Sequence, residues 1–216
     1  ADPKARESLL HHLETSIAYT MKKRGPHGLP LIGHADWNDC LNLNCFSSEP
    51  NESFQTAGDV KDAKAESVMI AGLFLYASRE MAGLYDFLNQ PAEAARMRAH
   101  RAEMLKAVEE QAWDGAWYRR AYDAAGKPVG SKACDEGKIF IESQGWCVLG
   151  GAGQDNGRAR QAMESVHELL YTKNGVVLQQ PAYSTYHAEL GEVTSYPPGV
   201  KENAGIFCHN NTWIHL

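Results

Sequence analysis

The sequence predicts an all-α fold, because helices that are apolar on almost every face alternate with helices that are apolar on one side. Residues 64–88 belong to the first kind, which is typical of a helix buried all round. Residues 91–112 and 155–171 belong to the second kind, and residues 144–149 are again apolar throughout. This alternation fits an α/α toroid and also any layered helical bundle. Periodicity alone therefore gives the class and not the architecture.

The elements follow in order along the chain. Residues 6–22 form the first expected helix, with one apolar face made by Leu9, Leu10, Leu13 and Ile17. Pro91 marks the start of the helix that spans residues 91–112. For this helix we expect an inward face made by Ala95, Ala99, Ala102, Leu105 and Val108. For residues 155–171 the expected inward face consists of Ala159, Ala162, Val166, Leu169 and Leu170.

Extended structure is expected in two places. Residues 117–122 alternate as a hairpin strand would, and residues 123–126 form its turn. Residues 175–193 are typical of a long loop with a short strand. Both segments are minor parts of a helical chain.

Composition narrows the function classes. The chain has 216 residues, 44% of them hydrophobic, and a net charge of −6, which argues against a nucleic-acid partner. No apolar run approaches the length of a membrane span, so we expect no membrane association. The five cysteines lack CxxC spacing, which indicates neither a metal site nor a disulfide framework and favours the cytoplasm. The chain starts without Met and stops on apolar residues, so we expect a piece of a longer protein.

The segment 33–40 carries the strongest chemical signal. It places Asp36, Trp37 and Asp39 within four residues. An indole offers an apolar face to a sugar ring, and it can desolvate a neighbouring carboxyl group so that the carboxyl keeps its proton and acts as a general acid. The alternative is a turn or helix cap in which both aspartates only accept backbone hydrogen bonds.

Several stretches together resemble one family. They are residues 36–46, 51–56, 65–68, 117–123, 137–146 and 195–209. In this order they resemble the inverting disaccharide phosphorylases of glycoside hydrolase family 94, and most of all its cellobiose-cleaving branch. The resemblance implies an (α/α)6 barrel with long loops at its open end, of which this chain would supply roughly half the helices. It also implies an N-terminal sugar-binding β-sandwich and further barrel parts outside this chain, and a homodimer.

The resemblance implies a role for each residue of the motif. Asp39 matches the general acid, and Trp37 matches a residue packed at the sugar subsite that would raise the pKa of the acid. Asp36 is expected to be structural, as a turn former or orienter. Gln144 and Trp146 are expected to approach the cavity from an inner helix, although core packing is the better interpretation for Trp146.

The C-terminal part of the match supplies the remaining contacts. His209 matches a phosphate ligand, although a single histidine is more often a satisfied core or surface group. Lys201 and Glu192 are expected to bind the acceptor glucose, and Glu202 is expected near the donor sugar. An alignment slip would exchange Glu192 for Glu189, and a Lys-Glu neighbour pair such as 201–202 is often only a solvated surface feature.

The implied reaction is the reversible phosphorolysis of cellobiose to α-D-glucose 1-phosphate and D-glucose. Phosphate is already anionic, so one acid and a cationic cradle suffice, and no metal or organic cofactor is expected. Phosphorolysis of chitobiose, laminaribiose or a cellodextrin stays open. Two other classes also stay open, namely an inverting hydrolase that uses Glu202 as base and a non-catalytic carbohydrate-binding fragment.

Overall fold

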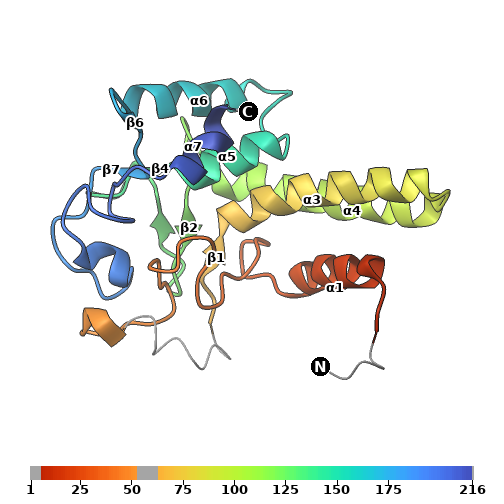
Figure 1. Cartoon of the computed structure of the whole chain (residues 1–216), viewed down its shortest axis with the longest axis horizontal. Helices are drawn as coiled ribbons and strands as arrows, with labels where there is room; N and C mark the ends of the chain where they lie inside the picture. The colour runs from red at the N-terminus through yellow and green to blue at the C-terminus, as the bar shows by residue number, and fades with distance from the viewer. Residues whose placement is uncertain (1–5, 53–62, 216) are drawn as a thin grey trace.

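The computed structural model describes residues 6–52 and 63–215, so residues 53–56 of the family-like stretch 51–56 lie outside the described residues. Helices dominate these residues, as the sequence predicts (Figure 1). The described residues form the α-helices α1 (Leu9–Lys22), α3 (Val68–Phe87), α4 (Pro91–Ala107), α5 (Ile141–Leu149), α6 (Arg158–Leu169) and α7 (Cys208–His215). They also form the short helical turns η1 (Pro50–Glu52), η2 (Val108–Ala112) and η3 (Glu192–Ser195).

The described strands are all two residues long, and they pair antiparallel. Strands β1 (Glu66–Ser67), β2 (Ala121–Tyr122) and β3 (Pro128–Val129) form one sheet. Two further pairs are β4 (Ile139–Phe140) with β7 (Gln179–Gln180), and β5 (Tyr171–Thr172) with β6 (Gly175–Val176). The predicted hairpin is confirmed, because Asp123 accepts the backbone N–H of Ala125 and of Lys127 in the turn between β2 and β3.

Local signals explain where the first helices begin. The Ser8 hydroxyl accepts the N–H of His11 at the start of α1, and the Ser67 hydroxyl accepts the N–H of Ile70 at the start of α3. Pro91 occupies the first turn of α4, where a helix has no use for the missing N–H. These signals are readable in the sequence, and the helix starts agree with the predictions to within a few residues.

Helix α3 packs between α4 and α5, and its contacts with them form the largest part of the core. Gly72 allows the closest approach, since a Cβ at this position would come within 2.6 Å of the backbone N of Cys147 on α5. The expectation that this helix is buried on every face is wrong, because Leu73, Tyr76 and Phe87 are exposed. Figure 1 shows the reason, since α3 and α4 extend together beyond the other elements.

The predicted inward face of the helix over residues 91–112 is only partly right. Val108, in η2, is buried as expected and Leu105 packs partly buried against the core, but Ala95, Ala99 and Ala102 are exposed. The buried face of α4 carries Ala94, Met97 and Met104. Small alanines occur on several faces of this helix and do not mark the core. The two methionines remove far more apolar surface from water, and they set the face that packs on α3.

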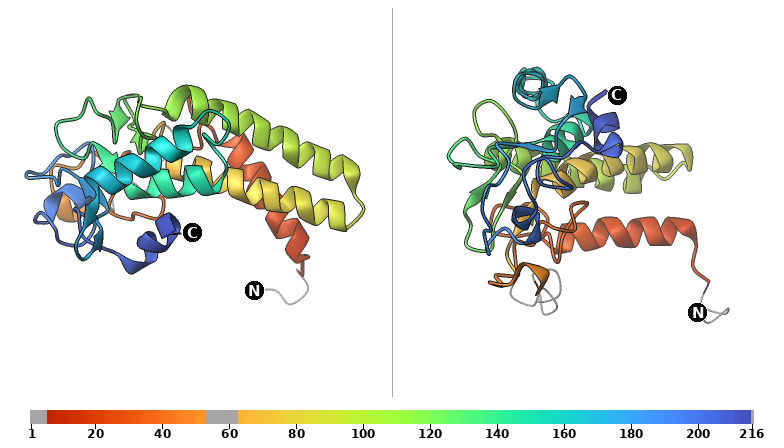
Figure 2. Two further views of the ribbon diagram at one scale, coloured as in Figure 1. Left: turned by 90° about the horizontal axis from the view of Figure 1, so that it is seen from above. Right: turned by 60° about the vertical axis from the view of Figure 1, so that its left-hand side comes forward.

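Two other predicted faces are only partly right. On α6, Ala162, Val166 and Leu170 are buried as expected, but Leu169 is 45% exposed. On α1, Ile17 is buried, whereas Leu9 and Leu13 are exposed. Figure 2 shows α1 lying to one side of the α3–α4 pair, which leaves part of its apolar face uncovered. None of the described helices is both long and apolar enough to cross a membrane.

Loops and strands gather at the opposite end of the molecule from the tip of the α3–α4 pair (Figure 1). The motif loop and the segment 183–196 meet there through backbone hydrogen bonds, from Asn42 N to the Leu190 carbonyl and from Val193 N to the Cys40 carbonyl. Trp37, Asp39, Lys201 and Glu202 are therefore carried by loops fixed to a helical and strand framework, whereas Glu192 lies in η3 and His209 in α7. The closed ring of an (α/α)6 barrel stays a prediction.

Candidate active site

Asp36 anchors the motif loop to the core. Its carboxylate receives two hydrogen bonds from Arg120, at 2.5 and 2.6 Å, and one from the Ser67 hydroxyl at 2.6 Å. It also accepts the backbone N–H of Asn38, which closes a turn within the loop. The Arg120 and Asp36 side chains are 0% and 1% exposed. This geometry agrees with the structural role expected for Asp36.

Arg120 is shared between two buried carboxyl groups. Burial alone would raise the pKa of Asp36, but the charge and hydrogen bonds of Arg120 outweigh burial and lower that pKa. Glu142 lies 3.8 Å from Arg120, and burial raises the pKa of Glu142 to about 7 against the opposing effect of Arg120. Neither carboxyl oxygen of Glu142 has a hydrogen-bond partner among the described residues. Arg120 therefore interacts more closely with Asp36 than with Glu142.

Asp39 occupies a different environment in the same loop. It is exposed, and no hydrogen bond of its carboxylate is found among the described residues. Its backbone carbonyl accepts the side-chain N–H of Asn42 at 2.7 Å, and the Asn38 side chain accepts the N–H of Cys40. The backbone is thus held while the carboxyl group is left available to a ligand. The turn-forming interpretation applies to Asp36 and not to Asp39.

Tyr196 lies at the centre of a cluster that contains three of the predicted sugar-binding residues, Glu192, Lys201 and Glu202. Its hydroxyl donates to Glu192 at 2.5 Å, and the Lys201 ammonium lies 4.5 Å from its ring centroid. The Cys40 thiol lies 3.4 Å from the Tyr196 hydroxyl and 3.7 Å from the Glu202 carboxylate. Cys40 is the residue after Asp39, so this cluster adjoins the predicted general acid.

The thiol and the phenol of this cluster both stay protonated near neutral pH. Burial, with the nearby Glu202 and Glu192 carboxylates, raises the pKa of Cys40 to about 11 although its hydrogen bond to Tyr196 acts the other way. Burial and the hydrogen bonds to Cys40 and Glu192 raise the pKa of Tyr196 as well. Lys201 adopts a left-handed backbone conformation with φ of 49°, which is uncommon for a residue with a side chain and is frequent at functional sites.

Glu192 and Glu189 lie in different places. Glu192 joins Tyr196, whereas the Glu189 carboxylate lies 3.7 Å from Nδ1 of His187. The structure therefore separates the two glutamates that an alignment slip would exchange. The sequence analysis assigned no role to Tyr196 or Cys40, although both lie within the family-like stretches 195–209 and 36–46.

Trp37 lies in an aromatic group with the C-terminal helix. Its ring centroid is 5.6 Å from that of Phe207, 5.8 Å from that of His209 and 5.7 Å from that of Trp213. Trp37 and His209 thus lie close together, although they are 172 positions apart in the sequence. His209 is exposed, so its imidazole is open to a ligand.

Two expectations about α5 need correction. Gln144 is completely buried and bonds the backbone N–H and carbonyl of Tyr118 at 2.8 and 2.7 Å, which is a core role and not an approach to a cavity. Trp146 is only half-buried and contacts Trp213, with ring centroids 5.4 Å apart, so it joins the aromatic group instead of the deep core.

Among residues 6–52 and 63–215, no group of three or more His, Cys, Asp or Glu side chains could hold a metal ion. The arrangement instead offers an exposed carboxyl group, an aromatic face, an ammonium group and carboxylates that accept hydroxyl donors. Such a set suits a polyhydroxylated ligand and proton transfer to it.

The helical framework and this set of polar and aromatic groups are compatible with a carbohydrate-active catalytic domain. The chain belongs to the glycosyl hydrolase 94 superfamily, whose catalytic-domain profile matches residues 1–216. The described helices are compatible with such a helical catalytic domain.

The chain is also similar in sequence to individual members of this and related groups of enzymes. The chain is 33% identical to the solabiose phosphorylase of Paenibacillus borealis over 203 residues, and 32% identical to the N,N'-diacetylchitobiose phosphorylase of Vibrio proteolyticus over 208 residues. The two alignments cover 94% and 95% of this chain and 24% of each relative. The cyclic beta-(1,2)-glucan synthase NdvB of Rhizobium meliloti (strain 1021) is 31% identical over 208 residues, which cover 95% of this chain and 7% of the synthase. The chain thus spans about a quarter of the length of the phosphorylases it matches.

Proposed function

We propose that this chain carries part of the active site of an inverting phosphorylase that cleaves a β-linked disaccharide. The observation that carries the proposal is the exposed Asp39 carboxyl group on a loop fixed by Asp36 and Arg120. The adjoining cluster of Glu192, Tyr196 and other polar groups supports it, because it is suited to sugar hydroxyls. Membership of the family and the likeness to two phosphorylases support it independently.

In this proposal Asp39 donates a proton to the oxygen of the glycosidic bond, and phosphate attacks the anomeric carbon from the opposite face. Lys201 and Glu192 bind the acceptor sugar, and Glu202 lies near the donor sugar. Trp37 packs against a sugar ring. The remaining group, His209, donates a hydrogen bond to phosphate together with residues from elsewhere in the protein. The co-substrate is inorganic phosphate, and no metal or organic cofactor takes part.

We propose cellobiose as the first substrate to test, with α-D-glucose 1-phosphate and D-glucose as products. Support comes from the sequence between Cys40 and Thr56, which resembles the cellobiose-cleaving branch. The two phosphorylases compared above are named for solabiose and N,N'-diacetylchitobiose, so these disaccharides are the next candidates. We also propose that the complete enzyme is a cytoplasmic homodimer, an assignment supported by the family resemblance and by the five free thiols.

The test is a phosphorus NMR time course with the full-length protein, cellobiose and phosphate, beside its Asp39→Asn variant. We expect α-glucose 1-phosphate from the parent, and a rate at least about 100-fold lower from the variant, because the amide cannot protonate the leaving group. Asp155→Asn, in the exposed loop before α6, is the matched control and should retain the rate of the parent.

Three results would overturn this assignment. Free glucose formed without sugar phosphate would identify a hydrolase, and Glu202 would then be tested as its base. Full activity of Asp39→Asn would remove Asp39 from the mechanism. Failure to turn over cellobiose, solabiose, chitobiose or laminaribiose while the protein still binds them would indicate a carbohydrate-binding role.

A further inference from the structure

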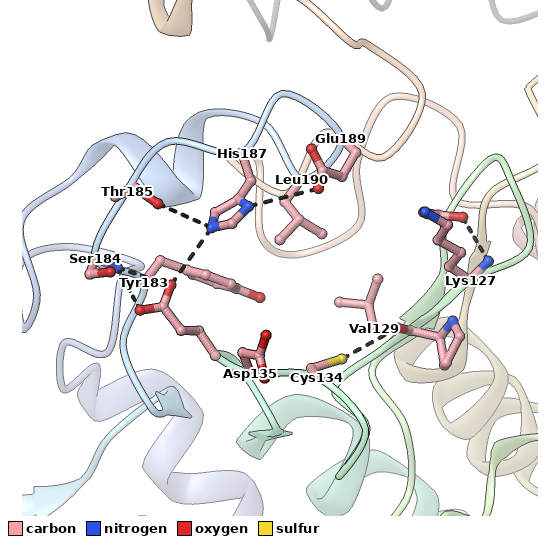
Figure 3. Close-up of a pocket in the computed structure, with 13 residues that line it drawn as sticks. Lys127, Val129, Cys134, Asp135, Tyr183, Ser184, Thr185, His187, Glu189 and Leu190 are labelled. Atoms are coloured by element: carbon pink, nitrogen blue, oxygen red, sulfur yellow. Dashed lines mark hydrogen bonds and ion pairs between the residues drawn. The ribbon is translucent and has the colours of Figure 1, made fainter.

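One pocket of the described structure is lined by residues other than those assigned to sugar and phosphate. It is a pocket of about 440 Å³ between the β2–β3 hairpin, the loop that follows it, and residues 183–190 (Figure 3). None of the six residues proposed above for the reaction lines it. Its volume falls within the range of small-molecule sites.

The walls of the pocket are preformed. Asn203 binds both the backbone N–H and the carbonyl of Tyr183 at 2.8 Å, and Glu136 accepts the N–H of Ser184. The N–H of His187 donates to the Thr194 hydroxyl at 2.8 Å. These bonds hold the segment 183–190 in place, so a ligand would not have to order it.

Tyr183 provides the observation that points to a ligand. Its side chain is only 3% exposed, and Figure 3 shows its hydroxyl directed into the pocket. No hydrogen bond of this hydroxyl is found among the described residues. Burial raises the pKa of Tyr183, so the phenol stays neutral and can donate. A nearly buried polar group without a protein partner calls for a water or a ligand in that position.

Charge decides the class of ligand. The lining carries four carboxylates, from Asp123, Asp135, Glu136 and Glu189, against the single ammonium group of Lys127. His187 lies between two of these carboxylates, 3.6 Å from Glu136 and 3.7 Å from Glu189. Even with a protonated His187 the carboxylates outnumber the cations, so a phosphate or a sugar phosphate would be repelled. A ligand with a positive charge and hydrogen-bond donors is favoured.

The apolar residues of the lining indicate that the ligand also has a carbon framework. Pro128, Val129 and Leu190 contribute apolar surface beside the polar groups. We propose that this pocket binds a small hydroxylated organic cation, of the amino-sugar or amino-alcohol class. Glu189 and Asp135 attract its ammonium group, and Tyr183 and His187 bond its hydroxyl groups. This proposal is independent of the phosphorylase assignment.

The test uses three ring-matched probes with the full chain, namely glucosamine, glucose and glucuronate. Measurements are made in low salt at about pH 6.5, where an amine of this kind is protonated. Binding is followed by amide chemical shifts, which separate residues 183–190 from the motif loop. We expect glucosamine to change the amide chemical shifts of residues 183–190 and to bind with at least about fivefold higher affinity than glucose. Glucuronate should leave these chemical shifts unchanged.

Two variants test the residues. Glu189→Gln should weaken the binding of glucosamine roughly two- to fivefold, as expected for the loss of a partly exposed ion pair. Glu164→Gln, on the exposed face of α6, should not change this affinity. Tyr183→Phe should weaken the binding of glucosamine without changing the fold. Equal affinity for glucose and glucosamine would contradict the cationic class. Absence of shifts in 183–190, or equal effects of the two glutamine variants, would overturn the site.

Discussion

Asp36 and Asp39 belong to one loop, and the surroundings of their carboxyl groups explain their different roles. Asp36 is enclosed by Arg120 and the Ser67 hydroxyl, so it remains ionised and fixes the backbone. Asp39 is exposed beside the Tyr196 cluster, where a substrate can reach it. The Arg120 side chain donates its hydrogen bonds to Asp36 and none to Glu142. Glu142 is therefore a buried carboxyl group with a raised pKa.

This raised pKa predicts a dependence of stability on pH. The folded protein holds the Glu142 proton up to about pH 7, whereas the unfolded chain releases it near the ordinary value of 4.5. Between these values the folded state binds more protons, so its stability falls as the pH rises. Replacing Glu142 by Gln removes the titrating group and should flatten the curve between about pH 4.5 and about pH 7.

The measurement is urea unfolding of parent and variant at several pH values across this window. Asp36 does not interfere, because its lowered pKa acts below its ordinary value of 3.8. Glu164→Gln, on the exposed face of α6, serves as the control and should leave the slope of the parent unchanged. An unchanged slope in Glu142→Gln would show that this carboxyl group is not protonated in the folded protein.

At the scale of elements, the contact between α3 and α5 depends on backbone proximity. Gly72 lies against the backbone of Trp146 and Cys147, and a Cβ there would approach both at 2.6 Å. Gly83 lies on the same helix, and nothing is within 4 Å of a Cβ built on it. Both glycines therefore lose the same conformational entropy on forming the helix, but only Gly72 is needed for close packing.

The pair predicts opposite effects of one substitution. Gly72→Ala should destabilise the protein by about 1–3 kcal/mol, because the helices must move apart. Gly83→Ala should stabilise it by about 0.5–1 kcal/mol, because alanine loses less conformational entropy in a helix. Thermal or urea unfolding of the two variants checks this. Equal effects on stability would mean that the close approach of α3 and α5 is not a constraint.

Across the molecule, the buried hydrophobic residues in the described part of the chain form three clusters. One joins α3, α4 and α5, a second lies under the motif loop and the β2–β3 hairpin, and a third lies between α6 and the β4–β7 pair. Helix α1 contributes Ile17 to the first cluster and leaves Leu9 75% exposed. A hydrogen bond from Tyr85 to Glu14 also attaches it to α3.

This uneven attachment predicts uneven protection against hydrogen exchange. The amides of α1 should exchange faster than those of α3 and α5, because few buried contacts oppose the local opening of α1. Hydrogen–deuterium exchange followed by mass spectrometry of peptides from each helix would measure the difference. Similar protection in α1 and α3 would show that α1 opens only with the whole domain.

The helical class, the approximate helices, the β2–β3 hairpin and the family could be predicted from the sequence alone, because these depend on local period, turn residues and motif order. Other features arise only from tertiary packing, which buries Met97 and Met104 on α4, pairs Asp36 with Arg120, and brings Cys40 to Tyr196. The last two contacts join residues far apart in the chain. Their choice depends on how whole elements pack, and the pattern of neighbouring residues does not encode it.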